Sequence, residues 1–430
     1  MMKLMNSVAL LVVAAGMLSF KTLPSDTVQR ATQPVPDKDN AGLQLPGGFS
    51  ALKVADSLGK ARHLVVTPQG LIYVRLARPK DGKGTLILQE GNNGKAKVVG
   101  GFGGYGGTGL YLKNGYLYVS SNQEVFRYKV NNKNEVLNPD QPEKIVTGLK
   151  MGKQHETKSI LVDDAGNLFV TIGAPSNSCQ EDDRKPGSMG IQGCPLLDSA
   201  GGIWQFKADK LNQTYSDGVR YATGLRNVVG LDWNQQSNQL YVMQHGRDQL
   251  NILFPDMYTD KLSAELPAEC MYALKQGDNA GWPYIYYDQI QHKKILAPEY
   301  GGDGKKEGDS KYIDPVIAFP GHMAPNGLLF YTGNMFPEKY KNGAFIAFHG
   351  SWNRAPLPQE GFSVAFVPFK NGKPSGQWEW FARGFSGVSE VISTRQANHR
   401  PVGLAMGADG SLFVTDDVQG TVYRIVYTNK

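Results

Sequence analysis

A histidine and an Arg-Asn pair each stand directly before a short apolar segment, where their side chains could do chemistry. His155 lies between Gln154 and Glu156, and its unperturbed pKa of about 6.5 suits the removal of a proton from a substrate. Arg226 offers planar donors that match a carboxylate, and the adjacent Asn227 adds an amide. An exposed loop histidine and a surface salt bridge are the plain structural alternatives.

A glycine-containing turn, residues 244–248 (QHGRD), follows the next apolar segment. Ca²⁺ prefers oxygen ligands, so the main-chain carbonyls of Gly246 and Arg247 could hold this cation, with the Asp248 carboxylate close enough to assist. Residues with donor or aromatic side chains stand at comparable places beside later apolar segments: His322, Trp352, Arg354 and Arg400. All of these residues are far apart in sequence, so the fold must bring them together.

The elements that would position these residues form a repeat. A short apolar strand, a turn rich in Asp, Asn or Gly and a second apolar strand recur six times, at 63–75, 109–120, 159–172, 229–244, 326–348 and 402–416. Six units over residues 43–430 give about 65 residues each, which suits four short strands with long loops. Radial stacking would cover both faces of each sheet. The sequence therefore predicts an all-β, six-bladed β-propeller with four-stranded antiparallel blades, with a pair of packed β-sandwiches as the alternative.

In a propeller, the loops that lead into the hairpins would converge at one mouth of the central channel, where distant residues can meet. Helix periodicity is weak, and we expect only a turn or two of helix at 264–275.

The N-terminus differs from the repeats. Lys3 and the apolar run at 8–18 are typical of a secretory signal, which we place at 1–20, followed by a polar linker at 21–42 and the propeller at 43–430. An uncleaved membrane anchor is the alternative, and no later segment is apolar enough to span a bilayer. We expect the protein in the periplasm or outside the cell. Its 45 Lys and Arg and 39 Asp and Glu are scattered, which argues against nucleic acid as a partner.

Three cysteines are present. Cys179 and Cys194 bound a polar loop, and an exported protein lies where disulfides persist, so we expect these two to be bonded. Cys270 is left over and is expected to be a buried, apolar residue rather than a reactive thiol. Arg184, inside the polar loop, is expected to be an exposed arginine.

Several segments in a fixed order resemble one known family. They are GLRNVVGLDW, the HGRD turn, DNAGWPY, FYTGNMFPEKYKNGAFIAFHGSWNR and RPVGLAMGADGSLFVTDDVQGTVYRI. Together they resemble the soluble glucose and sorbosone dehydrogenases, propellers that use pyrroloquinoline quinone (PQQ), and especially the sorbosone or aldose dehydrogenase-like branch. The resemblance runs from about Leu43 to Tyr427 and includes the SNSCQ…GCP loop, which supports the pairing of Cys179 with Cys194.

The resemblance implies roles for the residues named above. His155 would be the catalytic base, Arg226 and Asn227 would contact the quinone, and the main chain of Gly246 and Arg247 would hold its Ca²⁺. The remaining candidates for cofactor contacts around the quinone are Arg354, Arg400, His322 and Trp352. The sequence departs from the family at two positions that could reshape the pocket mouth, His245 and Met323.

The resemblance thus implies oxidation of an aldose or sugar aldehyde, with hydride transfer to a Ca²⁺-bound quinone, His155 as the base and an electron acceptor that the sequence does not identify. One alternative is a calcium-dependent sugar lactonase, which would hold its metal mainly by side chains. Another is a non-catalytic carbohydrate- or protein-binding propeller, in which Trp282 and Trp352 would stack on the ligand.

Overall fold

The computed structural model describes residues 34–428. The signal sequence expected at 1–20 and most of the linker expected at 21–42 lie outside this range. The described end of the linker carries the short 3₁₀ helix η1 (Asn40–Gly42), which leads into the first strand. Within the described residues no helix is long and apolar enough to cross a bilayer.

The six hairpins predicted from the sequence are all present, and each supplies the two inner strands of a sheet. In chain order they are β2 (Ala61–Val66) with β3 (Leu71–Lys80), β6 (Leu110–Lys113) with β7 (Tyr116–Ser120), β10 (Ile160–Val162) with β11 (Asn167–Ile172), β15 (Val228–Asn234) with β16 (Gln239–Gln244), β22 (Pro325–Phe330) with β23 (Ala344–Phe348), and β28 (Pro401–Met406) with β29 (Leu412–Asp416). Local chemistry explains the turns. Between β6 and β7, for example, Asn114 and Gly115 both have positive φ, as a type I′ hairpin requires.

Further strands complete six sheets, which we number in the order of their inner strands. The first adds β4 (Lys83–Glu90) and β5 (Ala96–Phe102), the second β8 (Val125–Lys129) and β9 (Glu143–Thr147), the third β12 (Gly202–Lys207) and β14 (Val219–Thr223), the fourth β17 (Glu269–Leu274) and β21 (Ile317–Phe319), the fifth β24 (Ser363–Val367) and β27 (Glu379–Ala382), and the sixth β30 (Val422–Tyr427) and β1 (Phe49–Ala55). Two sheets gain a short fifth strand in parallel, β13 (Gln213–Thr214) beside β9 and β18 (Asp278–Asn279) beside β14. The blades are otherwise four-stranded and antiparallel, as predicted.

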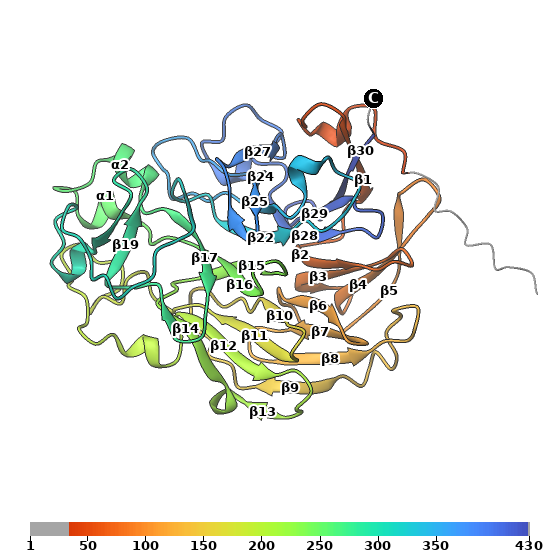
Figure 1. Ribbon diagram of the computed structural model, residues 1–430, viewed down its shortest axis with the longest axis horizontal. Helices are drawn as coiled ribbons and strands as arrows, with labels where there is room; N and C mark the ends of the chain where they lie inside the picture. The colour runs from red at the N-terminus through yellow and green to blue at the C-terminus, as the bar shows by residue number, and fades with distance from the viewer. Residues whose placement is uncertain (1–33, 429–430) are drawn as a thin grey trace, which may run out of the picture. The chain divides into compact units, whose positions relative to one another are not determined.

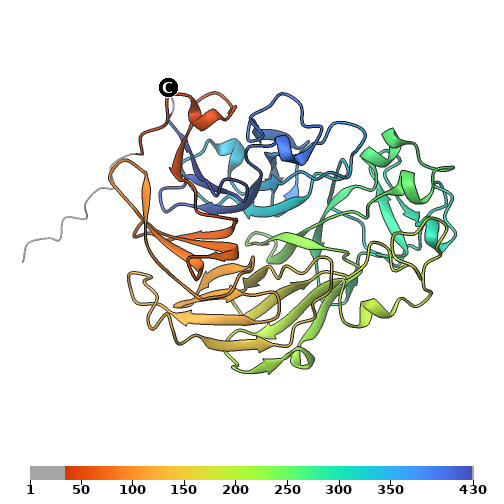
Figure 2. The ribbon, with the colours of Figure 1, turned by 180° about the vertical axis from the view of Figure 1, so that it is seen from behind.

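The sheets close into a ring. The inner strands β2, β6, β10, β15, β22 and β28 contact one another in this order, and β28 contacts β2. Figures 1 and 2 show the first sheet, near the red end of the colour range, beside the sixth, near the blue end. The N-terminal strand β1 pairs with the C-terminal strand β30, from Phe49 opposite Tyr427 onward, so both ends of the described chain share one sheet. The fold is therefore a six-bladed β-propeller.

The hydrophobic core is divided among the spaces between neighbouring sheets. On β3, Ile72 and Val74 pack toward the sixth sheet, whereas the intervening Tyr73 packs toward the second. Alternate residues of a strand point to opposite faces, so a strand covered on both sides is apolar at nearly every position. The second strands β7, β11 and β23 are likewise buried at nearly every position.

The prediction of a turn or two of helix at 264–275 is largely wrong. A short helix, α2 (Asp260–Glu265), ends at the start of this segment, and the rest forms β17. Residues 269–274 lie between β16 and β21 and gain ladder hydrogen bonds on both sides, which local sequence cannot reveal. The helix α1 (Leu250–Leu253), α2 and the hairpin β19 (Ile285–Asp288) and β20 (Lys293–Leu296) belong to insertions in the fourth blade.

The expectations for the cysteines are confirmed. Cys179 and Cys194 form a disulfide, with 6.2 Å between their Cα atoms. Cys270 is a free, buried thiol on β17.

Candidate functional site

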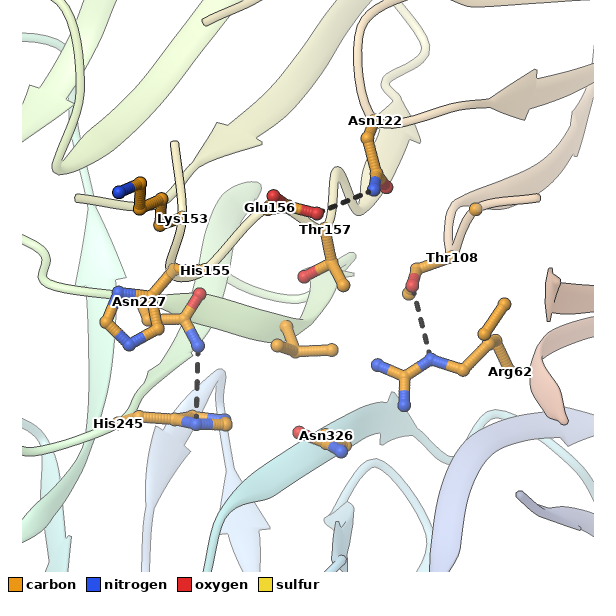
Figure 3. Close-up of a pocket in the computed structure, with 13 residues that line it drawn as sticks. Arg62, Thr108, Asn122, Lys153, His155, Glu156, Thr157, Asn227, His245 and Asn326 are labelled. Atoms are coloured by element: carbon orange, nitrogen blue, oxygen red, sulfur yellow. Dashed lines mark hydrogen bonds between the residues drawn. The ribbon is translucent and has the colours of Figure 1, made fainter. Parts of the chain in front are cut away.

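A pocket of ≈ 400 Å³ lies at the ends of the inner strands, where loops of five sheets meet. Figure 3 shows the side chains that surround it. Its polar lining residues are Arg62, Thr108, Asn122, Lys153, His155, Glu156, Thr157, Asn227, His245 and Asn326. The convergence of the hairpin loops at one mouth is thus observed, and the lining is rich in cationic and amide groups.

His155 lines this pocket in a fixed tautomer. Its Nδ1–H donates to the carbonyl oxygen of Ala174 at 2.6 Å, so in the neutral ring Nε2 keeps the free lone pair. Burial, reinforced by the nearby positive charge of Arg226, lowers the pKa of His155 to about 3. The imidazole is therefore neutral at ordinary pH and can accept a proton at Nε2.

The position of His155 depends on a glycine beneath it. A Cβ atom on Gly173 would come within 2.5 Å of the His155 Cβ and 3.0 Å of Asn227 Oδ1. His155 itself adopts positive φ (53°), which is uncommon for a residue other than glycine. Only a residue without a side chain at 173 lets the base and Asn227 approach each other in this way.

Asn227 also lines the pocket, and His245 orients its amide (Figure 3). His245 Nε2–H donates to Pro325 O at 3.2 Å, which leaves Nδ1 to accept from Asn227 Nδ2 at 3.4 Å. Burial lowers the pKa of His245 to about 4, so this ring is neutral as well. The amide oxygen of Asn227 is buried and has no hydrogen-bond partner among the described residues. The departure at His245 thus has a local role: it fixes which way Asn227 points.

The opposite side of the pocket carries donors that the sequence analysis did not select. Arg62 donates from Nε to Thr108 Oγ1 (3.2 Å) and from one terminal nitrogen to Asp417 Oδ2 (3.1 Å). Asn122 Nδ2 donates to Glu156 Oε2 at 3.4 Å, as Figure 3 shows. These residues stand beside inner strands, just as His155 does. Arg62 directly precedes the predicted hairpin at 63–75, so the position that singled out His155 and Arg226 also applies to it, and extending this rule to amides and to the ends of the hairpins would have found Asn122.

Arg226 is buried in a network of protein groups instead of lining the pocket. Its guanidinium donates to Gly246 O (2.7 Å), to Asp248 Oδ2 (2.7 Å) and to the main-chain and side-chain oxygens of Asn177 (both 3.1 Å). Burial by itself would raise the pKa of Asp248, but Arg226, His322 and Arg184 hold it well below its ordinary value. A direct contact between Arg226 and a cofactor stays a prediction.

The turn expected to hold Ca²⁺ is tightly anchored. Gly246 N donates to Glu269 Oε2 at 3.0 Å while its carbonyl accepts from Arg226, and the Asp248 carboxylate accepts from Arg226, Arg184 and Asn353. Among residues 34–428 no group of three or more His, Cys, Asp or Glu side chains is arranged to hold a metal ion. The roles of Gly246, Arg247 and Asp248 as cation ligands therefore stay predictions. The Arg247 guanidinium itself points away to Glu299, at 2.7 Å.

Two of the other predicted site arginines are also committed to protein partners. Arg354 is buried and donates to Ala264 O and Glu265 Oε1, each at 2.6 Å. Arg400 donates to the main-chain oxygens of His349 and Gly350.

His322 and Trp352 differ in exposure. The Nε2 atom of His322 lies 2.8 Å from Ser263 O, and its Nδ1 lies 3.7 Å from Asp248 Oδ1. Trp352 is 58% exposed. Of the sequence-predicted side chains, the structure thus brings His155 and Asn227 to the pocket and places Arg226, Arg354, Arg400, His322 and Trp352 outside its lining.

Arg184 is not the exposed arginine that the sequence suggested. Only 26% of its side chain is exposed, and it forms an ion pair with Asp248 at 2.9 Å. The polar loop around it is folded back against the site.

A closed ring of six blades and a polar pocket around a neutral histidine define the class: a six-bladed β-propeller with a polar pocket at the ends of its inner strands. The sequence matches the TrAA12-like family over residues 43–428, and the chain belongs to this family.

Curated relatives agree with this assignment. A pyrroloquinoline quinone-dependent sugar dehydrogenase of Hypocrea jecorina is 24% identical over 402 residues, 89% of this chain and 86% of that protein. A pyrroloquinoline quinone-dependent pyranose dehydrogenase of Coprinopsis cinerea is 28% identical over 278 residues, 56% of this chain and 36% of that protein. A Borreliella burgdorferi protein is 30% identical over 206 residues, 48% of each chain. The chain thus spans less than half the length of the last two relatives. The resemblance to PQQ-dependent sugar dehydrogenases is confirmed.

Solved structures share the fold. A calcium structure of a Trichoderma reesei enzyme of family AA12 superposes with a TM-score of 0.72 at 19% identity, covering 93% of this chain and 99% of that one. The holo PQQ domain of the Coprinopsis cinerea pyranose dehydrogenase gives 0.68 at 21% identity, with the same coverage. At these identities the likeness shows the six-bladed architecture.

Proposed function

We propose that this protein is a quinoprotein that oxidises an aldose or a sugar aldehyde with PQQ and Ca²⁺. The observation that carries the proposal is His155, a neutral imidazole with its Nε2 lone pair free, in a pocket whose lining includes two cationic side chains, three asparagine amides and the Glu156 carboxylate. The names of two relatives, a sugar dehydrogenase and a pyranose dehydrogenase that depend on PQQ, support the same chemistry.

The pocket suits the quinone in donor chemistry. PQQ carries three carboxylates, and Arg62 and Lys153 supply positive charge in the lining while Asn122 and Asn326 supply amides. The buried, unpartnered oxygen of Asn227 is a polar atom that a bound group would satisfy. When bound, the quinone supplies a two-electron acceptor and Ca²⁺ supplies a Lewis acid. The main-chain oxygens of Gly246 and Arg247, with the Asp248 carboxylate close by, would hold the cation.

The chain's own residues then divide the work of the reaction. His155 Nε2 takes the proton of the anomeric hydroxyl, or of an aldehyde hydrate, as the substrate loses hydride, and Ala174 O stabilises the protonated ring through Nδ1–H. The pair of Asn122 and Glu156, which lies at the same pocket, offers a donor and an acceptor for sugar hydroxyls.

We also propose a periplasmic or extracellular location. A disulfide between Cys179 and Cys194 is typical of oxidising compartments and supports this assignment.

Reconstitution of the apoprotein tests the proposed function. Purified protein is titrated with PQQ in the presence of Ca²⁺, and the quinone absorption spectrum and the reduction of a dye with added aldoses are recorded. We expect a spectral shift at one quinone per chain and aldose-dependent dye reduction, both prevented by EDTA during loading. A protein that binds sugar but not quinone would instead be a binding propeller, and hydrolysis of sugar lactones with Ca²⁺ alone would favour the lactonase.

A further inference from the structure

The disulfide-closed loop, residues 179–194, lies against two segments of the candidate site. Within it, Asp183 accepts hydrogen bonds from Ser176 Oγ (2.7 Å) and Asn177 N (2.9 Å), which fix its carboxylate. The same carboxylate accepts from Gln154 Nε2 at 2.7 Å. Gln154 immediately precedes His155, so the loop is hydrogen-bonded to the segment that carries the proposed base.

Arg184, the next residue of the loop, also binds Gln154 and in addition binds Asp248 and Gln249. One terminal nitrogen donates both to Gln154 Oε1 (3.0 Å) and to Asp248 Oδ2 (2.9 Å), and the other donates to Gln249 Oε1 (2.9 Å). Asp183 and Arg184 therefore bind both ends of the Gln154 amide. The same guanidinium thus reaches Asp248, the last residue of the turn at 244–248.

The backbone of Arg184 has a conformation that is unusual for a residue with a side chain. Its φ is +61°, in the left-handed region that residues with side chains rarely adopt. Its N–H donates to Gln180 Oε1 at 3.0 Å, and Gln180 itself forms a β-bridge to Gly190 across the loop. Strained residues of this kind persist where surrounding contacts fix them, and they gather at functional sites.

We propose that Arg184 is a positioning residue: its guanidinium ties the segment of His155 to the turn at 246–248, so that the base and the carbonyl of Gly246 keep a constant separation. This inference rests on the proposed function. The geometry requires arginine in particular. A lysine keeps the charge, but a single ammonium on a flexible stem cannot hold Gln154, Asp248 and Gln249 through two planar nitrogens.

The test compares three variants with a matched control. The variants are Arg184→Lys, Gln154→Ala and the two combined. The control is Arg220→Lys, since Arg220 is also a partly exposed arginine that donates to a main-chain oxygen, that of Leu197, and lies near a carboxylate, that of Asp198. In quinone-loaded protein we expect Arg184→Lys to lower kcat about tenfold while KM for the sugar changes less than about threefold, because misplaced reacting groups slow chemistry more than binding. The double variant should be no slower than the slower single variant, since both changes break one link.

A second measurement does not depend on the cofactor. The imidazole resonance of His155 is identified in the NMR spectrum of the apoprotein by its loss in His155→Gln. We expect Arg184→Lys and Gln154→Ala each to shift this resonance, and Arg220→Lys to leave it in place.

An unshifted His155 resonance in both Arg184→Lys and Gln154→Ala, or additive losses of kcat in the double variant, would overturn the inference. Should Arg184→Lys fail to fold, the Gln154→Ala resonance decides alone. A wild-type protein that binds no quinone would overturn the proposed function, and that result is separate from the resonance shift, which reports the link within the chain.

Discussion

The imidazole of His155 shows how few contacts set the chemistry of a single residue. One carbonyl oxygen, that of Ala174, fixes its tautomer, and the absence of a side chain at Gly173 lets it lie close to Asn227. Burial and the charge of Arg226 then keep the ring unprotonated. Arg226 lies outside the pocket lining and lowers the pKa of His155 through its positive charge.

Replacing His155 by Gln should retain the fold and quinone binding while lowering turnover by roughly 10²–10⁴, the usual contribution of a positioned general base. The measurement is dye reduction with aldose, alongside quinone titration of the same preparation. A variant that binds quinone and turns over at the wild-type rate would assign the base to another group.

The pH profile of the wild type gives a separate expectation for His155. The pKa of its imidazole is lowered to about 3, so the group is an unprotonated base at every pH above about 4. We expect kcat/KM, which reports the free enzyme, to show no loss near pH 6.5 from this residue and to fall only in strong acid. An acid limb centred near 6.5 that disappears in His155→Gln would contradict the lowered pKa.

Arg226→Lys should destabilise the apoprotein by about 2–3 kcal/mol, because the buried ammonium cannot satisfy Gly246 O, Asp248 and Asn177 together. Urea unfolding measures this change, with Arg220→Lys as the control. Quinone affinity should fall as well, since the turn at Gly246 loses its anchor. Unchanged stability and affinity would show that the network is dispensable.

At the scale of elements, the strands of each blade fix where its loops lie, and the loops carry the side chains of the candidate site. The third blade supplies His155 from the segment before β10, and the disulfide-closed loop after β11 folds back to hold that segment through Asp183 and Arg184. The fourth blade supplies Asn227 and the turn after β16. Neighbouring blades therefore share one site although each is a separate sheet.

Removal of the disulfide by the double change Cys179→Ser and Cys194→Ser should lower the free energy of unfolding by roughly 3 kcal/mol, as expected for a closed loop of this length. Urea unfolding of the variant should match that of the reduced wild type. Cys270→Ala, which changes a thiol outside the bridge, should keep its response to reducing agent. Equal stability of the oxidised wild type and the double variant would contradict this expectation.

At the scale of the molecule, pairing of β1 with β30 joins the two ends of the described chain and closes the ring. The closed ring buries several titratable groups whose pKa values move in opposite directions. Burial lowers the pKa of His63 and His245 to about 4 and raises the pKa of Asp232 and Glu269 to about 7. The histidines make the fold less stable as pH falls, whereas the two carboxyl groups make it less stable as pH rises.

His63 allows one of these contributions to be isolated. Because its folded pKa lies below the unfolded value of about 6.5, the unfolded chain binds the proton first and stability is lost as pH drops from about 6.5 to about 4. His63→Gln removes the titration, so its stability relative to wild type should improve by about 2 kcal/mol between pH 7.5 and about 4.5. Urea unfolding at both pH values checks this, and a constant difference would contradict it.

The architecture of this protein follows from local features of its sequence. Alternating apolar residues and turn residues are local properties, so the six hairpins could be predicted, and so could the bridge between Cys179 and Cys194. His155 and Asn227 were selected by their positions directly before hairpins, and the family resemblance implied their roles. The helix prediction at 264–275 was wrong because the strand in this segment is stabilised by its pairing with β16 and β21 rather than by its own residues.

Which donors face the pocket depends instead on how the blades pack against one another. Arg226, Arg354 and Arg400 looked alike in sequence, yet each is committed to carbonyl or carboxylate oxygens, most of them from other parts of the ring. Arg62, Asn122 and Asn326 were not selected from the sequence, yet they reach the lining from three different sheets. A charged side chain turns toward whichever partners compensate its loss of water, and those partners are set by how blades distant in sequence pack together.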